Sequence, residues 1–331
     1  MDALFEGEHV EILDSTDTDH RYGHYPSKRP LELLMNQGLI VLDKPRGPTS
    51  HQVVSWVKGI LGIERAGHHG TLDPNTTGVL PIALGGAVRM LDLTLEEGKE
   101  YIALMHLHRE VNGDHLRTIL GEFTGRIYQM VPVRSAVKRG LRERSIEQMK
   151  VLDNREGEVL LRISCESGTY IRTLIHDMGE VLGVGANMVE LRRSRSGRLR
   201  EDSSVTLQGL RDAWELFKDS GSEEELRRVI HPSELLVDHL PKAYLKDSAV
   251  DAVCHGAPVG RPGLGAMDTR IRKGSHTAVM TLKGEIVALG TSLMDYGEAA
   301  GRSKGMCIKV DRVIMDPGTY PRAWKTRSGK G

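Results

Sequence analysis

The chain has 331 residues, and its 45 basic and 45 acidic side chains give a formal net charge of zero. Hydrophobic residues make up 39% of the chain and charged residues 27%, which indicates a globular protein of about two domains rather than a disordered or fibrous chain. No apolar run approaches a membrane span, and the N-terminal stretch is acidic, so we expect neither a membrane anchor nor a signal peptide.

The cysteines and the charges restrict the environment further. Cys165, Cys254 and Cys307 are far apart and odd in number, which argues against a disulfide framework and a zinc knuckle and favours the cytoplasm. Residues 1–20 hold seven acidic side chains and no Lys or Arg, so we predict a solvated acidic tail over residues 1–27. Removing that tail leaves the body of the chain basic.

Two basic clusters, in residues 134–150 and 192–200, suit an RNA phosphate backbone, although a solvated face is the usual role of such runs. They contain Arg134, Lys138, Arg139, Arg142, Arg144, Lys150, Arg192, Arg193, Arg195, Arg198 and Arg200.

The first half of the chain alternates strand and helix patterns. An apolar strand is expected at residues 38–42, followed by a helix that Ser50 would cap and that presents apolar residues at helical spacing up to residue 61. Strands are expected at residues 79–84 and 101–107. His106 and His108 would share a strand face, but without a third ligand we favour pairing or exposure over metal binding.

Further along, a strand at residues 159–165 leads into an amphipathic helix at 171–182, and helices follow at 205–217 and 223–230. A domain boundary is expected near residues 232–241. Beyond it, Gly-rich turns separate short apolar runs at residues 277–282, 285–289 and 306–315, a pattern typical of a small β-barrel.

The most informative stretch is the loop at residues 67–78, Gly-His-His-Gly-Thr-Leu-Asp-Pro-Asn-Thr-Thr-Gly. Glycines and Pro74 restrict the backbone around a single carboxylate, Asp73. A carboxylate held in this way is a candidate catalytic group, and a simple turn cap is the alternative. The chain has no Walker-type loop, Gly-x-Gly-x-x-Gly string or His-Glu-x-x-His motif, so no cofactor or metal is indicated.

Five motifs in order resemble the family that joins bacterial tRNA pseudouridine-55 synthase to the dyskerin-like subunit of H/ACA ribonucleoproteins. They are the loop above, a Lys-Pro motif, an aromatic motif, an arginine motif and a Leu-Arg-Arg motif. These occupy residues 67–78, 39–51, 99–101, 166–174 and 188–197, respectively.

The C-terminal region resembles a PUA RNA-binding domain at residues 245–257, 283–290 and 312–315. The resemblance therefore implies an α+β pseudouridine-synthase fold, with a mixed, largely antiparallel sheet and flanking helices, plus a small PUA β-barrel. It places the catalytic domain at residues 28–236 and the PUA domain with a basic tail at 237–331.

The implied reaction converts uridine to pseudouridine within RNA and needs no cofactor. In it Asp73 is the catalytic group, acting either as a nucleophile or as a base at the ribose, and Arg172 is its cationic partner. Tyr101 would stack on the extruded base, with a further option of helping to remove the C5 proton.

For the remaining site residues, the resemblance implies either contact with the base or a role in shaping the loop. Tyr170 and Leu191 would pack against the base, with ordinary core packing as the alternative. Lys44, Pro45 and Gly70 would shape the loop.

This chain departs from the family pattern at His69, where Ser is more usual, and at Asn75, where Lys is more usual. Loss of that lysine removes one phosphate contact, so we expect this departure to affect RNA affinity more than the catalytic step.

Lys28 to Leu34 and the basic C-terminal tail resemble the archaeal H/ACA branch of the family. That branch implies a guide RNA, substrate rRNA or tRNA, and three protein partners: a small zinc-ribbon protein, a Gly-rich β-barrel protein and a kink-turn-binding protein. Two alternatives stay open, a guide-independent tRNA pseudouridine synthase and an inert RNA scaffold.

Overall fold

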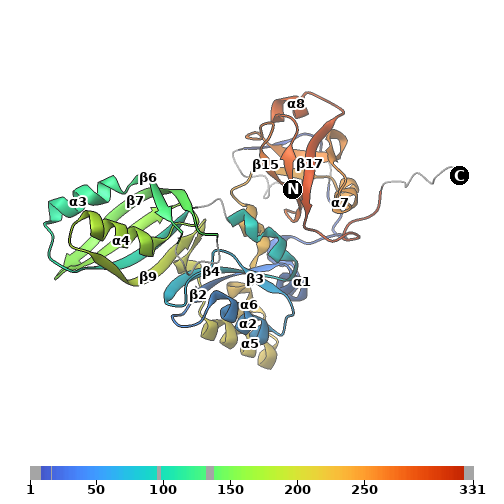
Figure 1. Cartoon of the computed structure of the whole chain (residues 1–331). Coiled ribbons are helices and arrows are strands. Elements are labelled where there is room, and N and C mark those ends of the chain that lie inside the picture. Colours follow the sequence, from blue (N-terminus) through green and yellow to red (C-terminus); the bar gives the residue numbers. More distant parts are fainter. Residues whose placement is uncertain (1–8, 16, 95–97, 132–137, 324–331) are drawn as a thin grey trace. The chain divides into compact units, whose positions relative to one another are not determined.

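The computed structural model describes residues 9–15, 17–94, 98–131 and 138–323 (Figure 1). The chain forms two compact units. One contains residues 38–231, and the other combines residues 1–37 with residues 232–331. No helix in the described part of the chain is long and apolar enough to cross a membrane.

The unit of residues 38–231 is built on a mixed sheet in the order β2-β4-β9-β5-β8-β7-β6, with β3 on β4 and β10 on β9. Only β4 and β9 run parallel among these pairings. The strands are β2 (Gly38–Lys44), β3 (Ala66–His68), β4 (Thr76–Leu84), β5 (Lys99–Leu107), β6 (Gly125–Met130), β7 (Leu141–Arg155), β8 (Glu158–Cys165), β9 (Ala186–Ser196) and β10 (Leu199–Arg200).

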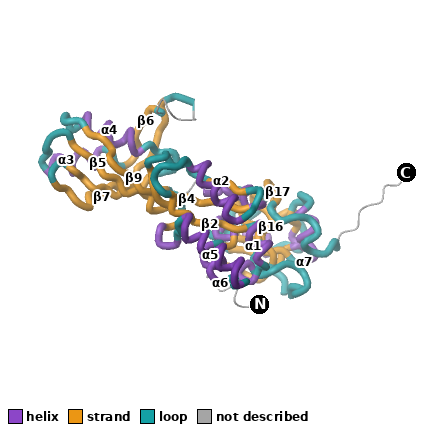
Figure 2. The backbone as a smooth tube through the Cα atoms, turned by 90° about the horizontal axis from the view of Figure 1, so that it is seen from below, coloured by secondary structure: helices purple, strands orange, loops and turns teal. Residues whose placement is uncertain are grey.

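Helices α3 (Gly113–Glu122) and α4 (Ile171–Val181) lie along one side of the strands β5, β7 and β9 (Figure 1, Figure 2). Alternate residues of β5 and β8 point into the core beneath them, because successive side chains of a strand face opposite sides of a sheet. Helix α4 buries Leu174, Ile175 and Met178 on the stripe that faces this core.

Helix α2 (Ser50–Leu61) packs on α5 (Leu207–Ser220), which also contacts β2 (Figure 2). The helix ends at Gly62, whose φ of 66° favours glycine. The predicted cap at Ser50 is wrong by one residue. Thr49 is the N-cap and forms a capping box with Gln52, which leaves Ser50 inside the first turn. The rest of this unit comprises η3 (Gly85–Thr94), η4 (Glu201–Ser203) and α6 (Glu224–Val229). Strand β11 (His231–Pro232) lies beside β2 in the sheet order.

The second unit is a seven-stranded barrel-like sheet in the order β1-β14-β12-β15-β16-β17-β13. Its strands are β1 (Val10–Ile12), β12 (Lys242–Leu245), β13 (Val259–Gly260), β14 (Leu264–Asp268), β15 (His276–Thr281), β16 (Ile286–Ser292) and β17 (Met306–Val313). Its helical elements are η2 (Pro26–Lys28), α1 (Leu31–Asn36), η5 (Ser233–Val237), α7 (Asp247–Cys254), η6 (Arg261–Gly263) and α8 (Tyr296–Ala300).

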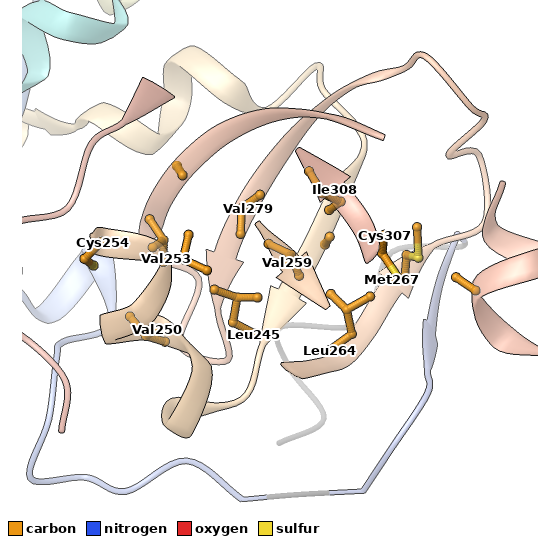
Figure 3. Close-up of a cluster of buried hydrophobic side chains, with 14 of the residues drawn as sticks. Leu245, Val250, Val253, Cys254, Val259, Leu264, Met267, Val279, Cys307 and Ile308 are labelled. Carbon is orange, nitrogen blue, oxygen red and sulfur yellow. The ribbon is translucent and has the colours of Figure 1, made fainter. Parts of the chain in front are cut away.

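The core of this unit is aliphatic. Figure 3 shows side chains from α7 and from strands of the sheet meeting at its centre, among them Leu245, Val253, Val279 and Ile308. Cys254 and Cys307 belong to this cluster as free thiols, and Cys165 lies free in the core of the other unit. The three cysteines therefore act as small apolar side chains, and burial raises the pKa of each thiol.

The N-terminal segment differs from the solvated tail that its acidity predicted. Val10–Ile12 pairs antiparallel with β14 as strand β1, and Thr18 and the Asp19 amide bond to the Asp247 carboxylate. Two buried side chains of the barrel, Lys283 and Glu285, also bond to the backbone of residues 19–24. Most of these contacts use backbone groups, which the charge pattern of the sequence does not show.

Candidate active site

Asp73 lies in the loop between β3 and β4, and the backbone on both sides of it is held by hydrogen bonds. On the N-terminal side, the Ser50 hydroxyl accepts a hydrogen bond from the Leu72 amide at 3.0 Å and donates one to the Leu72 carbonyl at 3.1 Å. On the C-terminal side, the Pro74 carbonyl accepts bonds from the Gly47 amide at 2.8 Å and from Lys44 Nζ at 3.1 Å. The loop is thus fixed at Leu72 and at Pro74.

Lys44 is completely buried and donates to three backbone carbonyls, those of Pro45, Pro74 and Thr76, at 2.9–3.1 Å. Burial lowers the pKa of its amine, and the nearby Asp73 carboxylate opposes that shift. Three carbonyl acceptors match the three hydrogens of an ammonium group, so the cation is satisfied without a carboxylate. Lys44 therefore ties the Lys-Pro turn to the loop that carries Asp73.

Arg172, the second residue of α4, reaches the Asp73 carboxylate. Its Nη2 atom donates to Asp73 Oδ2 at 3.0 Å, and the side chains of Arg172 and Asp73 are 61% and 64% exposed. The first turn of a helix disfavours a cation, so local helix chemistry does not explain this arginine. The two side chains share one hydrogen bond and are exposed to solvent, so the carboxylate and the guanidinium both keep free sites for a substrate.

Tyr101 is half-buried on β5, where it lies opposite Arg193 on β9 and Ile163 on β8. Burial raises the pKa of its hydroxyl, while the Arg193 guanidinium beside it and the Asp73 carboxylate act in opposite directions. The phenol therefore keeps its proton at neutral pH.

Tyr170 and Leu191 occupy half-buried positions at the edge of the same core. Tyr170 is the N-cap of α4, and its amide and carbonyl both bond to the side chain of buried Gln129. Leu191 lies opposite Thr76 on β4 and Ala103 on β5. Leu191 and Tyr101 both pack against the core cluster under α4. The tertiary fold thus places Leu191 opposite Thr76, which lies more than a hundred positions earlier in the chain.

Gly70 has a φ of 66°, and a Cβ atom there would lie 3.1 Å from Nη1 of Arg193. Arg193 is the site residue that sequence reasoning missed. It is only 1% exposed, donates from Nε to the Val79 carbonyl at 2.7 Å, and has no carboxylate among the partners that the structure describes. Strand alternation was the available signal, since one of two neighbouring arginines on a covered strand must face the core.

The basic clusters are therefore less available to RNA than their sequence indicated. Arg193 is buried, and Arg192 bonds to Asp43 and Glu201. In the other cluster, Arg144 bonds to Glu166 and to the Gly168 carbonyl, and Arg134 lies outside the described residues.

The histidines show no metal arrangement. Rings of His106 and His108 are 6.0 Å apart, His108 contacts Asn187, and no group of three or more metal-type ligands occurs in the described ranges. Near the loop, the His51 and His68 rings meet edge to face at 4.8 Å. Burial lowers the pKa of His68 to about 4, with His51, His69 and Arg193 acting in the same direction. His69 donates its amide to the Pro81 carbonyl, and Asn75 is exposed.

Four known domain families match parts of the chain. The TruB family pseudouridylate synthase N-terminal domain matches residues 58–171, and the tRNA pseudouridylate synthase B C-terminal domain matches residues 172–238. A DKCLD domain matches residues 3–54 and a PUA domain matches residues 241–314.

Curated relatives match nearly the whole chain. Probable tRNA pseudouridine synthase B of Pyrococcus abyssi is 50% identical over 312 residues, which cover 94% of this chain and 93% of that protein. The same-named protein of Methanopyrus kandleri is 49% identical over 308 residues, or 93% and 91% of the two chains. The chain belongs to the TruB family of pseudouridine synthases. It is therefore an RNA-modifying isomerase with a PUA domain.

Two solved structures resemble this pseudouridine synthase along its whole length. One is an H/ACA RNP bound to a substrate RNA containing 2'-deoxyuridine, with a TM-score of 0.88 and 45% identity over 96% of this chain and 98% of that chain. The other is the archaeal box H/ACA sRNP Nop10-Cbf5 complex, with a TM-score of 0.86 and 46% identity over 97% and 100%. The predicted fold class and the expected family are thereby confirmed.

Proposed function

We propose that this pseudouridine synthase acts as the catalytic subunit of an archaeal H/ACA particle and modifies uridines that a guide RNA selects. The observation that supports this most is the similarity of the whole chain, including the DKCLD and PUA regions, to chains solved within H/ACA complexes. The substrates would be rRNA and tRNA, including tRNA uridine 55, and the compartment the cytoplasm.

The proposed chemistry starts at Asp73. The target uridine leaves its stack, at a cost of a few kcal/mol, and enters beside the Asp73–Arg172 pair. The ionised carboxylate acts at the ribose, either by attack on C1′ or as a base, while Arg172 holds its orientation. The N1–C1′ bond breaks, the base rotates, and a C5–C1′ bond forms before C5 loses its proton.

The other site residues would hold the base. Stacking on Tyr101 recovers about 1–3 kcal/mol, and Tyr170 and Leu191 complete the pocket wall. Because Tyr101 keeps its proton at neutral pH, it acts more readily as a hydrogen-bond donor than as the base that removes the C5 proton. Lys44, Pro45 and Gly70 shape the loop.

The domain division that goes with this function assigns catalysis to residues 28–236 and guide anchoring to residues 237–331. Partners would include a guide RNA and proteins of the kinds called Nop10 and Gar1 in a solved Cbf5-Nop10-Gar1 complex. The family resemblance implies a small zinc-ribbon protein and a Gly-rich β-barrel protein among the partners, and a kink-turn-binding protein would complete the particle.

The test is pseudouridine mapping on rRNA and on tRNA incubated with the purified protein. Four mixtures are compared: protein alone, protein with partners, protein with guide RNA, and the complete set. Modification that requires the guide supports the proposal. Equal modification of bare tRNA in all four mixtures would instead identify a stand-alone tRNA enzyme, and no modification in any mixture would favour an RNA scaffold.

A further inference from the structure

Ser50 is a buried polar side chain to which neither the helix cap nor the proposed chemistry assigns a role. It is the first residue of α2 and is completely buried, yet Thr49, one position earlier, caps the helix. A buried hydroxyl is costly unless it finds partners, so its contacts indicate what it does.

Both partners of the Ser50 hydroxyl lie on Leu72, the residue before Asp73. The hydroxyl accepts from the Leu72 amide at 3.0 Å and donates to the Leu72 carbonyl at 3.1 Å. Leu72 lies in the loop between β3 and β4, with its side chain 3% exposed. One hydroxyl therefore satisfies both backbone hydrogen-bonding groups of Leu72, which a neighbouring strand would do in a sheet.

The helix that carries Ser50 is a rigid support. Its side chains Val53 and Val57 are fully buried, and its first turn is closed by the capping box of Thr49 and Gln52. Beyond Asp73, the Pro74 carbonyl is held by Lys44 and Gly47. The backbone of Asp73 is thus fixed on both sides, although its side chain is 64% exposed.

We propose that Ser50 is a positioning residue for the reaction, because its bridge to Leu72 sets the direction in which the Asp73 carboxylate leaves the loop. The proposal rests on Asp73 being the reacting carboxylate. Small displacements of a reacting group are expensive, since an error of 1 Å costs about a hundredfold in rate. Loss of the bridge should therefore slow the chemical step more than it weakens RNA binding.

Thr49 provides a matched control next to Ser50. Thr49→Ala removes the cap from the same helix turn, with an expected loss of about 2–4 °C in melting temperature, and the hydrogen bonds of the Thr49 side chain go to Gln52. Ser50→Ala removes the bridge and leaves both Leu72 groups without their partner. Ser50→Cys keeps the shape with a slightly larger atom, and its thiol, a weak donor and acceptor, weakens the bridge.

The experiment uses the full chain, assembled with guide RNA and partners as the mapping requires, with protein in excess over substrate RNA. It measures the single-turnover rate at saturation, the RNA dissociation constant and the melting temperature. We expect Ser50→Ala to lower the saturated rate about 10- to 100-fold, with RNA affinity within about threefold. The saturated rate of Ser50→Cys should fall between those of Ser50→Ala and the unchanged chain. The rate of Thr49→Ala should stay within about twofold of that of the unchanged chain.

Equal rates for Ser50→Ala and Thr49→Ala would overturn the proposal. If Ser50→Ala does not fold, Ser50→Cys carries the comparison, and hydrogen exchange of the Leu72 amide in the unchanged chain gives a second test. An amide that exchanges as fast as that of exposed Asn75 would show that the bridge is absent. Full activity of Asp73→Asn would instead remove the proposed catalytic group, so the two failures are distinguishable.

Discussion

The Asp73–Arg172 pair of the candidate site is exposed, whereas a charged pair of the barrel unit, Arg29 and Glu234, is buried. Asp73 and Arg172 stand in water with a single hydrogen bond between them. In the barrel unit, Arg29 and Glu234 form two hydrogen bonds at 2.7 and 3.2 Å and are 2% and 8% exposed.

The barrel charges hold parts of the chain that are distant in sequence. Glu234 also accepts from the Ile286 amide, and Glu285 accepts from the His24 amide and from the Tyr320 hydroxyl. A bonded, buried charge has no capacity left for a ligand, while an exposed, singly bonded pair has free acceptor and donor sites. Exposure therefore separates the charges that support the fold from those available for chemistry.

The largest expected effect is that of Asp73→Asn. The change keeps the shape and removes the charge that the chemistry needs, so we expect no measurable pseudouridine, at least about a thousandfold loss of rate. RNA affinity should stay within about tenfold, and stability should change by at most about 1 kcal/mol, because the ion pair is exposed. Measurable turnover by the purified variant would rule out Asp73 as the catalytic group.

Arg172→Ala should lose most of the activity for the same reason, and Arg172→Lys should not restore it, because a point charge does not reproduce the planar guanidinium. Single-turnover rates of the three proteins give the comparison. A lysine variant near the unchanged rate would show that Arg172 supplies charge only, which the single hydrogen bond in the free chain would allow.

In the barrel unit the effect should be on stability instead. Glu234→Gln leaves the Arg29 charge buried without its counter-charge, and we expect the free energy of unfolding of that unit to fall by about 3 kcal/mol. Glu298→Gln, which breaks an exposed pair with Arg302, should cost less than about 1 kcal/mol. Denaturant unfolding measures both. Similar costs for the two variants would contradict the distinction between buried and exposed pairs.

At neutral pH the smallest effect should come from His68, a neutral group beside the loop that affects stability only on acidification. Its pKa is about 4 in the folded chain against an ordinary value of 6.5, so the unfolded chain binds the proton more readily. Stability should therefore fall as the pH drops from about 6.5 to 4, by about 2–3 kcal/mol from this group. His68→Gln should reduce the slope of unfolding free energy against pH over that window, and an unchanged slope would show that His68 does not contribute.

The local sequence pattern was sufficient to predict most of the helices and strands. The strand predicted at 38–42 is β2, the helix predicted at 171–182 is α4, and the C-terminal runs became β15, β16 and β17. These succeed because apolar periodicity and Gly or Pro boundaries act within a few residues. The cap at Ser50 failed because Gln52 stands three residues after Thr49, a capping-box spacing that favours Thr49 over Ser50 as the N-cap.

The sequence by itself determined the order of the motifs, and with it the family, the reaction and the loop around Asp73. Only the tertiary structure decided which charges are buried. It placed Arg193 inside and Arg192 outside, and it turned an acidic N-terminal segment into strand β1 of the barrel. The physical reason is that burial and backbone hydrogen bonds join residues far apart in the chain, such as Val10 and Asp268, which no local pattern encodes.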